Sequence, residues 1–125
     1  MVTVLLVDDK PVVLQGLRMR LMLEPDLMVV GEARNGRDAL TLAQALHPDV
    51  VVMDVEMPDM DGITTTKRLR ELVPDTAVVL LSVHCDVETQ MRAHRAGAAA
   101  FVEKRGSAES LVQAVRDAAL GITGA

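Results

Sequence analysis

Short runs of mainly apolar residues recur along this chain and alternate with longer segments whose apolar residues lie three or four positions apart. The runs cover residues 3–7, 27–33, 50–54, 77–81 and 98–102. A short run without polar alternation is typical of a strand that is buried on both faces, as in a parallel sheet. The pattern therefore predicts five buried strands, each followed by polar residues or by a Pro- or Gly-containing turn.

The segments between these runs carry helix signals. Leu14, Leu17 and Leu21 lie on one face of the first predicted helix, and the fourth has the weakest apolar stripe, which rests on Val87 and Met91. The predicted helices cover residues 11–24, 35–46, 63–72, 86–96 and the segment after 107. Alternation of buried strands and helices predicts an α/β fold, a five-stranded parallel sheet with helices on both faces. We expect one domain over residues 1–120, with 121–125 as the start of a linker or a C-terminal tail.

Composition narrows the possible functions. The chain has 125 residues, of which half are apolar, and Phe101 is its single aromatic residue. Without aromatic platforms, flavin stacking and single-strand nucleic-acid binding are disfavoured. The net charge of −5, with no run of basic residues longer than two, also disfavours binding to nucleic acid, which is a polyanion. Seven methionines are predicted to fill the core and pack loops: Met19, Met22, Met28, Met53, Met57, Met60 and Met91.

A cytoplasmic location with no membrane contact is expected. Cys85 is the single cysteine, so no intrachain disulfide can form, which fits a reducing cytosol. There is neither a secretion signal nor an apolar stretch near 18 residues. His84 and Cys85 lack partners at zinc spacing, and loop packing is expected for both.

Polar residues follow the predicted strands at the points where these end. Asp8 and Asp9 end the first strand, Asp54 the third and Ser82 the fourth, and Lys104 follows the fifth. Parallel strands have their carboxyl ends at one edge of the sheet, where open α/β sheets bind ligands. We therefore expect three acids, a hydroxyl and an amine to converge there.

This set of residue types suggests phosphoryl chemistry. Clustered carboxylates repel one another, which raises carboxyl pKa values, and an oxygen-binding cation such as Mg²⁺ relieves that repulsion. A metal-bound phosphate beside Asp54 would allow attack by the carboxylate and give an acyl phosphate. Lys104 would then neutralise charge on the transferred group and Ser82 would hydrogen-bond another oxygen. Taken singly, each residue also has an ordinary structural role open to it, such as helix capping or a solvated charge.

The motifs at these strand ends resemble those of a two-component response regulator receiver domain, over nearly the whole chain. They are Leu6-Val7-Asp8-Asp9, Asp54 with Met57-Pro58-Asp59-Met60-Asp61-Gly62, Leu81-Ser82, Ala96-Gly97-Ala98, and Phe101 with Lys104. The chain is similar to the NarL/FixJ (LuxR-type) subgroup in particular. The resemblance implies a (βα)5 flavodoxin-like fold with strand order 2-1-3-4-5.

The resemblance also implies roles for the acids. Asp54 would accept a phosphoryl group from a histidine kinase. Asp9, Asp54 and the backbone carbonyl of Glu56 would hold Mg²⁺, with Asp8 assisting through water. Catalysis would be limited to the domain's own phosphorylation and dephosphorylation, in which Lys104 assists.

Ser82 and Phe101 would form a switch pair that responds to phosphorylation by changing the face made by the fourth helix, fifth strand and fifth helix. A homodimer would use that face, or the first and fifth helices. The subgroup normally carries a C-terminal DNA-binding domain that controls transcription. None follows in this sequence, so we expect a receiver fragment or a stand-alone regulator, and favour the fragment.

Four residues depart from the common family pattern. Arg105 replaces the proline that often follows the lysine, and a trans bond is therefore expected there. Lys10 stands where the subgroup usually has His, and Val83 is bulkier than the common Ala. Glu56 brings an extra acid close to the site.

Two enzyme or carrier alternatives fit the sequence less well. A phosphatase of the haloacid-dehalogenase kind would need its nucleophile on the first strand and a cap segment for which 125 residues leave no room. A flavodoxin-like cofactor carrier would need a phosphate-binding loop after the first strand, where Asp8 and Asp9 repel anions. A degenerate receiver that takes no phosphate is a third alternative, against which the complete set of acids, Ser82 and Lys104 argues.

Overall fold

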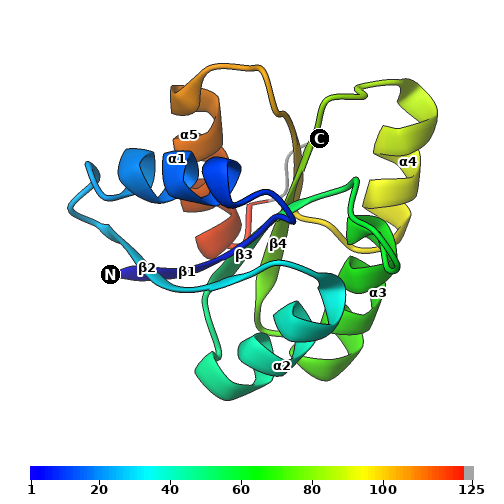
Figure 1. Ribbon diagram of the computed structural model, residues 1–125, viewed down its shortest axis with the longest axis horizontal. Coiled ribbons are helices and arrows are strands. Elements are labelled where there is room, and N and C mark those ends of the chain that lie inside the picture. The colour runs from blue at the N-terminus through cyan, green and yellow to red at the C-terminus, as the bar shows by residue number, and fades with distance from the viewer. Residues whose placement is uncertain (123–125) are drawn as a thin grey trace.

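The computed structural model describes residues 1–122, in which five strands alternate with five helices (Figure 1). The strands are β1 (Val2–Val7), β2 (Leu27–Ala33), β3 (Val50–Asp54), β4 (Ala77–Ser82) and β5 (Ala100–Glu103). The helices are α1 (Pro11–Leu21), α2 (Gly36–Leu46), α3 (Gly62–Leu72), α4 (Val87–Arg95) and α5 (Ala108–Ala119). All paired strands are parallel and the order is β2-β1-β3-β4-β5, which confirms the predicted fold.

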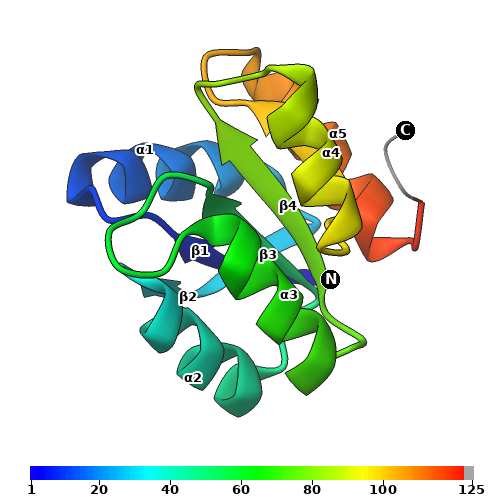
Figure 2. The same cartoon turned by 90° about the vertical axis from the view of Figure 1, so that its right-hand side faces the viewer.

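Helices cover both faces of the sheet. Helices α1 and α5 lie on one face and α2, α3 and α4 on the other, and Figure 2 shows β4 running between α3 and α4. Because successive strand residues point to opposite faces, Leu6 and Val52 pack with α1 and α5, whereas Leu5 and Val51 pack with the other three helices. Every residue of β3 is buried, as its apolar run predicted.

Two element boundaries differ from the predictions by more than one residue. Helix α1 ends at Leu21, because the following residues form a tighter turn in which the Glu24 N–H donates to the Leu21 carbonyl at 3.0 Å. Strand β5 begins at Ala100 rather than at 98. Gly97, at φ +98°, and Ala98 instead close α4, and the Ala98 N–H donates to the Ala93 carbonyl at 3.1 Å.

The prediction that the methionines fill the core is wrong for four of them. Met53 and Met57 are buried, but Met19, Met22, Met28 and Met91 are exposed. Helix α4 likewise buries Ala93 instead of the predicted stripe, which leaves Val87 72% exposed. Val87 and Met91 remain at the surface because α4 packs against the core through Ala93.

The peptide bonds of residues 1–122 are all trans, in agreement with the expectation for Lys104-Arg105. In the same part of the chain, no helix has the length and apolar character needed to cross a membrane. Residues 123–125 of the predicted tail lie outside the described residues, and the domain boundary at 120 stays a prediction.

Candidate functional site

Three carboxyl groups meet at the carboxyl-terminal edge of the sheet. Asp8 and Asp9 directly follow β1, and Asp54 is the last residue of β3. Each of the three offers an oxygen atom, and these atoms lie within 4.8 Å of one another. Asp8 and Asp54 are almost fully buried, with exposed fractions of 0% and 1%. The parallel topology thus brings together the acids that the sequence placed at separate strand ends.

Lys104 joins two of these acids. Its Nζ atom lies 2.9 Å from Asp8 Oδ2 and 3.1 Å from Asp54 Oδ2. The Lys104 backbone N–H donates to the Ser82 carbonyl at 2.8 Å, which holds the segment after β5 beside the end of β4. Burial works against the charged amine, but the hydrogen bonds to Asp8 and Asp54 outweigh it and raise the pKa of Lys104. The ammonium group is therefore a fixed positive charge at the site.

Asp54 has a strongly perturbed carboxyl group. Burial raises the pKa of Asp54 to about 6, and the neighbouring charge of Asp8 adds to the increase, while Lys104 opposes it. Repulsion between carboxylates, the predicted cause, is thus a smaller contribution than burial. At neutral pH the group is still mostly ionised, as a nucleophile needs to be.

One oxygen of Asp9 has no hydrogen-bond partner among the described residues. Asp9 Oδ1 is shielded from solvent, and the closest cation, Lys10 Nζ, lies 3.7 Å away, too far for a hydrogen bond. A buried carboxylate oxygen without a partner is costly, and a bound cation would satisfy it. The donors are all oxygens, which suits a hard cation such as Mg²⁺ or Ca²⁺. The cluster of Asp8, Asp9 and Asp54 therefore fits a metal ion.

Backbone contacts set the orientation of the two buried acids. Asp8 Oδ1 accepts the Lys10 N–H at 2.9 Å, and Asp54 Oδ1 accepts the Glu56 N–H at 3.3 Å. The loop after β3 then turns back so closely that a Cβ atom on Gly62 would lie 2.3 Å from the Asp54 carbonyl oxygen. Glycine is therefore required at position 62 for this loop to pass beside the site.

Ser82 lies at this edge too, but its hydroxyl contacts Glu56. Ser82 Oγ donates to Glu56 Oε1 at 2.8 Å and accepts the His84 N–H at 3.0 Å. Ser82 is fully buried. The sequence indicated an extra acid near the site at position 56, but the contact of its side chain with Ser82 was not predicted.

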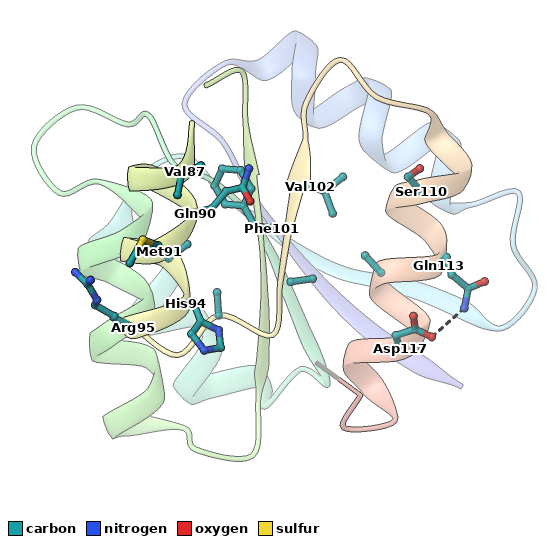
Figure 3. A pocket seen from close by; sticks show the side chains of 14 residues that line it. Val87, Gln90, Met91, His94, Arg95, Phe101, Val102, Ser110, Gln113 and Asp117 are labelled. Carbon is teal, nitrogen blue, oxygen red and sulfur yellow. Dashed lines mark hydrogen bonds between the residues drawn. The ribbon is translucent and has the colours of Figure 1, made fainter. Parts of the chain in front are cut away.

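Phe101 lies on β5, away from the acids, and is partly buried against the core. Figure 3 shows it between α4 and β5, with Val87, Gln90 and Met91 close by on α4. These residues line a groove of about 780 Å³ between α4, β5 and α5. The second predicted switch residue thus faces the groove, with its ring between the sheet and α4.

Comparisons with known proteins agree with this arrangement. A family model described as the response regulator receiver domain matches residues 4–116. The nitrate/nitrite response regulator protein NarL of Escherichia coli is 37% identical over 119 residues, covering 95% of this chain and 55% of that protein. A protein-glutamate methylesterase/protein-glutamine glutaminase of Methanospirillum hungatei is 42% identical over 106 residues, covering 83% of this chain but 30% of that protein.

A solved structure is similar over its whole length. The signal receiver domain of a response regulator NarL from Mycobacterium tuberculosis superimposes with a TM-score of 0.90 and 38% identity, covering 96% of this chain and 97% of that one. The chain therefore spans about half, or less, of the curated relatives above, and matches the isolated domain almost completely.

Proposed function

Because this chain belongs to the response regulator receiver domain family and is of the NarL/FixJ type, we propose that it is a switch that accepts a phosphoryl group on Asp54. Membership of this family argues against the two alternatives that the sequence left open, a phosphatase and a cofactor carrier. The observation that carries the proposal is the position of Lys104 Nζ between Asp8 and Asp54, at 2.9 and 3.1 Å. A buried nucleophile, a fixed cation and a carboxylate cluster are the components that phosphoryl transfer to a carboxylate needs.

In the proposed transfer, one bond to phosphorus forms and one bond to phosphorus breaks. A carboxylate oxygen of Asp54 forms a bond to phosphorus while the bond between phosphorus and an imidazole nitrogen of a histidine kinase breaks. The departing imidazole nitrogen takes up a proton from solvent. Lys104 stabilises negative charge on the transferred group, and Ser82 donates a hydrogen bond to one of its oxygens.

The metal in this proposal is Mg²⁺. Asp9, Asp54 and the backbone carbonyl of Glu56 would hold it, and Asp8 would act through a water molecule. When bound, Mg²⁺ supplies positive charge that offsets the charge of the phosphoryl oxygens. Asp9 Oδ1 supports this assignment, because a metal ion would give it the close contact that Lys10, at 3.7 Å, does not provide.

We assign signalling, and not turnover of an external substrate, to this chain. The methylesterase relative shares only 30% of its own length with it, so that name describes a longer protein. The proposed partners are a histidine kinase and a second copy of the chain. DNA would be contacted through an output domain of the kind that NarL-type regulators carry, and the proposed location is the cytoplasm.

The test is intact-mass measurement after incubation with acetyl phosphate, in Mg²⁺ and in EDTA. We expect the wild type to gain the mass of one phosphoryl group in Mg²⁺ but not in EDTA. Asp54→Asn should gain no mass in either condition. Asp59→Asn is the matched control, because Asp59 is an exposed acid of the same loop and should leave the gain intact. No gain in the wild type, or a gain that survives Asp54→Asn, would contradict the proposal and favour the degenerate receiver.

A further inference from the structure

We propose that Glu56 retains the Ser82 hydroxyl in the unphosphorylated protein, so that the phosphoryl group must displace Glu56 to engage Ser82. The relevant contact is the 2.8 Å hydrogen bond from Ser82 Oγ to Glu56 Oε1. This inference rests on the proposed function, because it assumes that Asp54 is the residue that becomes phosphorylated. It gives Glu56 the part of a positioning residue, which acts through Ser82 and not on the transferred group.

The Ser82 hydroxyl can donate a hydrogen bond to Glu56 or to a phosphoryl oxygen, but not to both at once. A serine hydroxyl has one proton, and in Ser82 that proton is donated to Glu56. The His84 N–H occupies a lone pair of the same oxygen at 3.0 Å. Ser82 is fully buried, so water does not compete for these positions. Phosphoryl oxygens accept hydrogen bonds, and they therefore require the same proton that Ser82 now donates to Glu56.

Charge favours the exchange once Asp54 is phosphorylated. Glu56 follows Asp54 by two residues, and its N–H donates to Asp54 Oδ1 at 3.3 Å, so both acids belong to one turn. A phosphoryl group adds a charge of about −1.5 to −2 close to the Glu56 carboxylate. Repulsion of that carboxylate and attraction of the Ser82 proton then act in the same direction.

The exchange of hydrogen-bond acceptors by Ser82 should also change the conformation of the loop before α4. The His84 N–H is bonded to the Ser82 hydroxyl, so a rotation of Ser82 moves or breaks a contact at the start of that loop. The loop leads into α4, whose residues Val87 and Met91 line the groove beside Phe101. Glu56 thus stabilises the unphosphorylated arrangement of the loop, and its loss should favour the other arrangement. A hydrogen bond to a charged acceptor corresponds to roughly a 10- to 150-fold change in such an equilibrium.

The experiment compares backbone amide NMR spectra of unphosphorylated variants, with Mg²⁺ in every sample. Glu56→Met removes the acceptor, Glu56→Gln keeps a neutral acceptor, and Asp59→Asn removes a charge from the same loop without touching Ser82. In Glu56→Met we expect the Ser82 and His84 amide signals to shift toward their positions in the phosphorylated wild type. Glu56→Gln should shift them less and Asp59→Asn not at all.

A double variant separates this inference from a general effect of charge. In a Ser82→Ala background, Glu56→Met should cause no further shift of the His84 amide signal. Unchanged Ser82 and His84 signals in Glu56→Met, or an equal shift with and without the Ser82 hydroxyl, would overturn the inference. Because this coupling is measured without phosphate, its absence would refute the role of Glu56 alone. A wild type that gains no phosphoryl mass would instead refute the proposed function.

Discussion

Lys104 and Asp54 are fifty positions apart in the chain and are joined by a 3.1 Å contact between Nζ and Oδ2. The contact exists because β3 and β5, on either side of β4, end at the same edge of the sheet. Lys104 stabilises the ionised form of Asp54 against the effect of burial, so the protonation state of the proposed nucleophile depends on a residue from outside its own strand.

Lys104→Met is expected to raise the pKa of Asp54 above its value of about 6, because the stabilising cation is removed while burial and the charge of Asp8 remain. The free energy of unfolding in EDTA at pH 8 should fall by about 2 kcal/mol, the cost of leaving a buried charged group unpaired. Carboxyl ¹³C NMR titration and urea denaturation measure these two quantities. Arg105→Met, which changes the exposed neighbouring cation, should alter neither; equal effects of both variants would contradict this role for Lys104.

Stability should decrease between about pH 4 and pH 7 through Asp54. The pKa of Asp54 is about 6 in the folded protein against an ordinary value of 3.8, so in this range the folded state binds more protons than the unfolded state, and the free energy of unfolding declines as pH rises. Asp54→Asn removes this dependence and is expected to raise that free energy at pH 8 in EDTA by about 2–3 kcal/mol.

Urea denaturation of the wild type and Asp54→Asn at a series of pH values measures the difference, which should shrink toward zero below pH 4. Asp59→Asn, in the exposed part of the same loop, should follow the wild type. A difference between the wild type and Asp54→Asn that stays constant with pH would show that burial does not control this carboxyl group.

Mg²⁺ should stabilise the folded protein through Asp9. Binding to the folded state alone contributes about 2.7 kcal/mol when the free ion is at one hundred times its dissociation constant. Thermal denaturation with and without Mg²⁺ is expected to show an upward shift of Tm in the wild type and little or none in Asp9→Asn. Asp75→Asn, an exposed acid in the turn between α3 and β4, should keep the full shift. A full shift in Asp9→Asn would place the cation elsewhere.

Gly62→Ala is expected to lower the free energy of unfolding by about 1–3 kcal/mol, the range typical of added atoms that force the backbone to shift. The added Cβ atom would meet the Asp54 carbonyl oxygen at 2.3 Å, which forces the loop after β3 to move. Gly16→Ala is the control of opposite sign. Gly16 lies exposed in α1 with open space around it, and alanine there should stabilise the helix by about 0.5–1 kcal/mol. Urea denaturation gives both values.

Phosphorylation-dependent self-association is expected on the face made by α4, β5 and α5. Phe101 lies on that face beside the exposed side chains of Val87 and Met91, whereas the exposed Met19 belongs to α1 and does not line that groove. Sedimentation of the phosphorylated protein should therefore show a dimer in the wild type and in Met19→Glu, and a monomer in Met91→Glu. The reverse result would assign the dimer to α1 and α5.

Much of the fold could be predicted from local patterns. Uninterrupted apolar runs such as residues 50–54 indicate strands with two buried faces, and strand–helix alternation restricts the sheet to parallel pairing. Parallel pairing then places Asp8, Asp54 and Lys104 at one edge without further information, because all strands point the same way. The strand order itself came from the family resemblance and not from the pattern.

Tertiary packing decided the rest. Which apolar side chains are buried depends on which helix surface meets the sheet, and for this reason Met91 is exposed although its spacing allows burial. The pKa of Asp54 depends mainly on burial, a property of the assembled structure. The sequence predicted that the Ser82 hydroxyl would bond a phosphoryl oxygen, whereas its bond to Glu56 is set by the path of the loop after β3. The sequence by itself determined which groups meet at the sheet edge, through strand direction; only the tertiary structure decided which of them pair, because pairing depends on side-chain distances that periodicity does not encode.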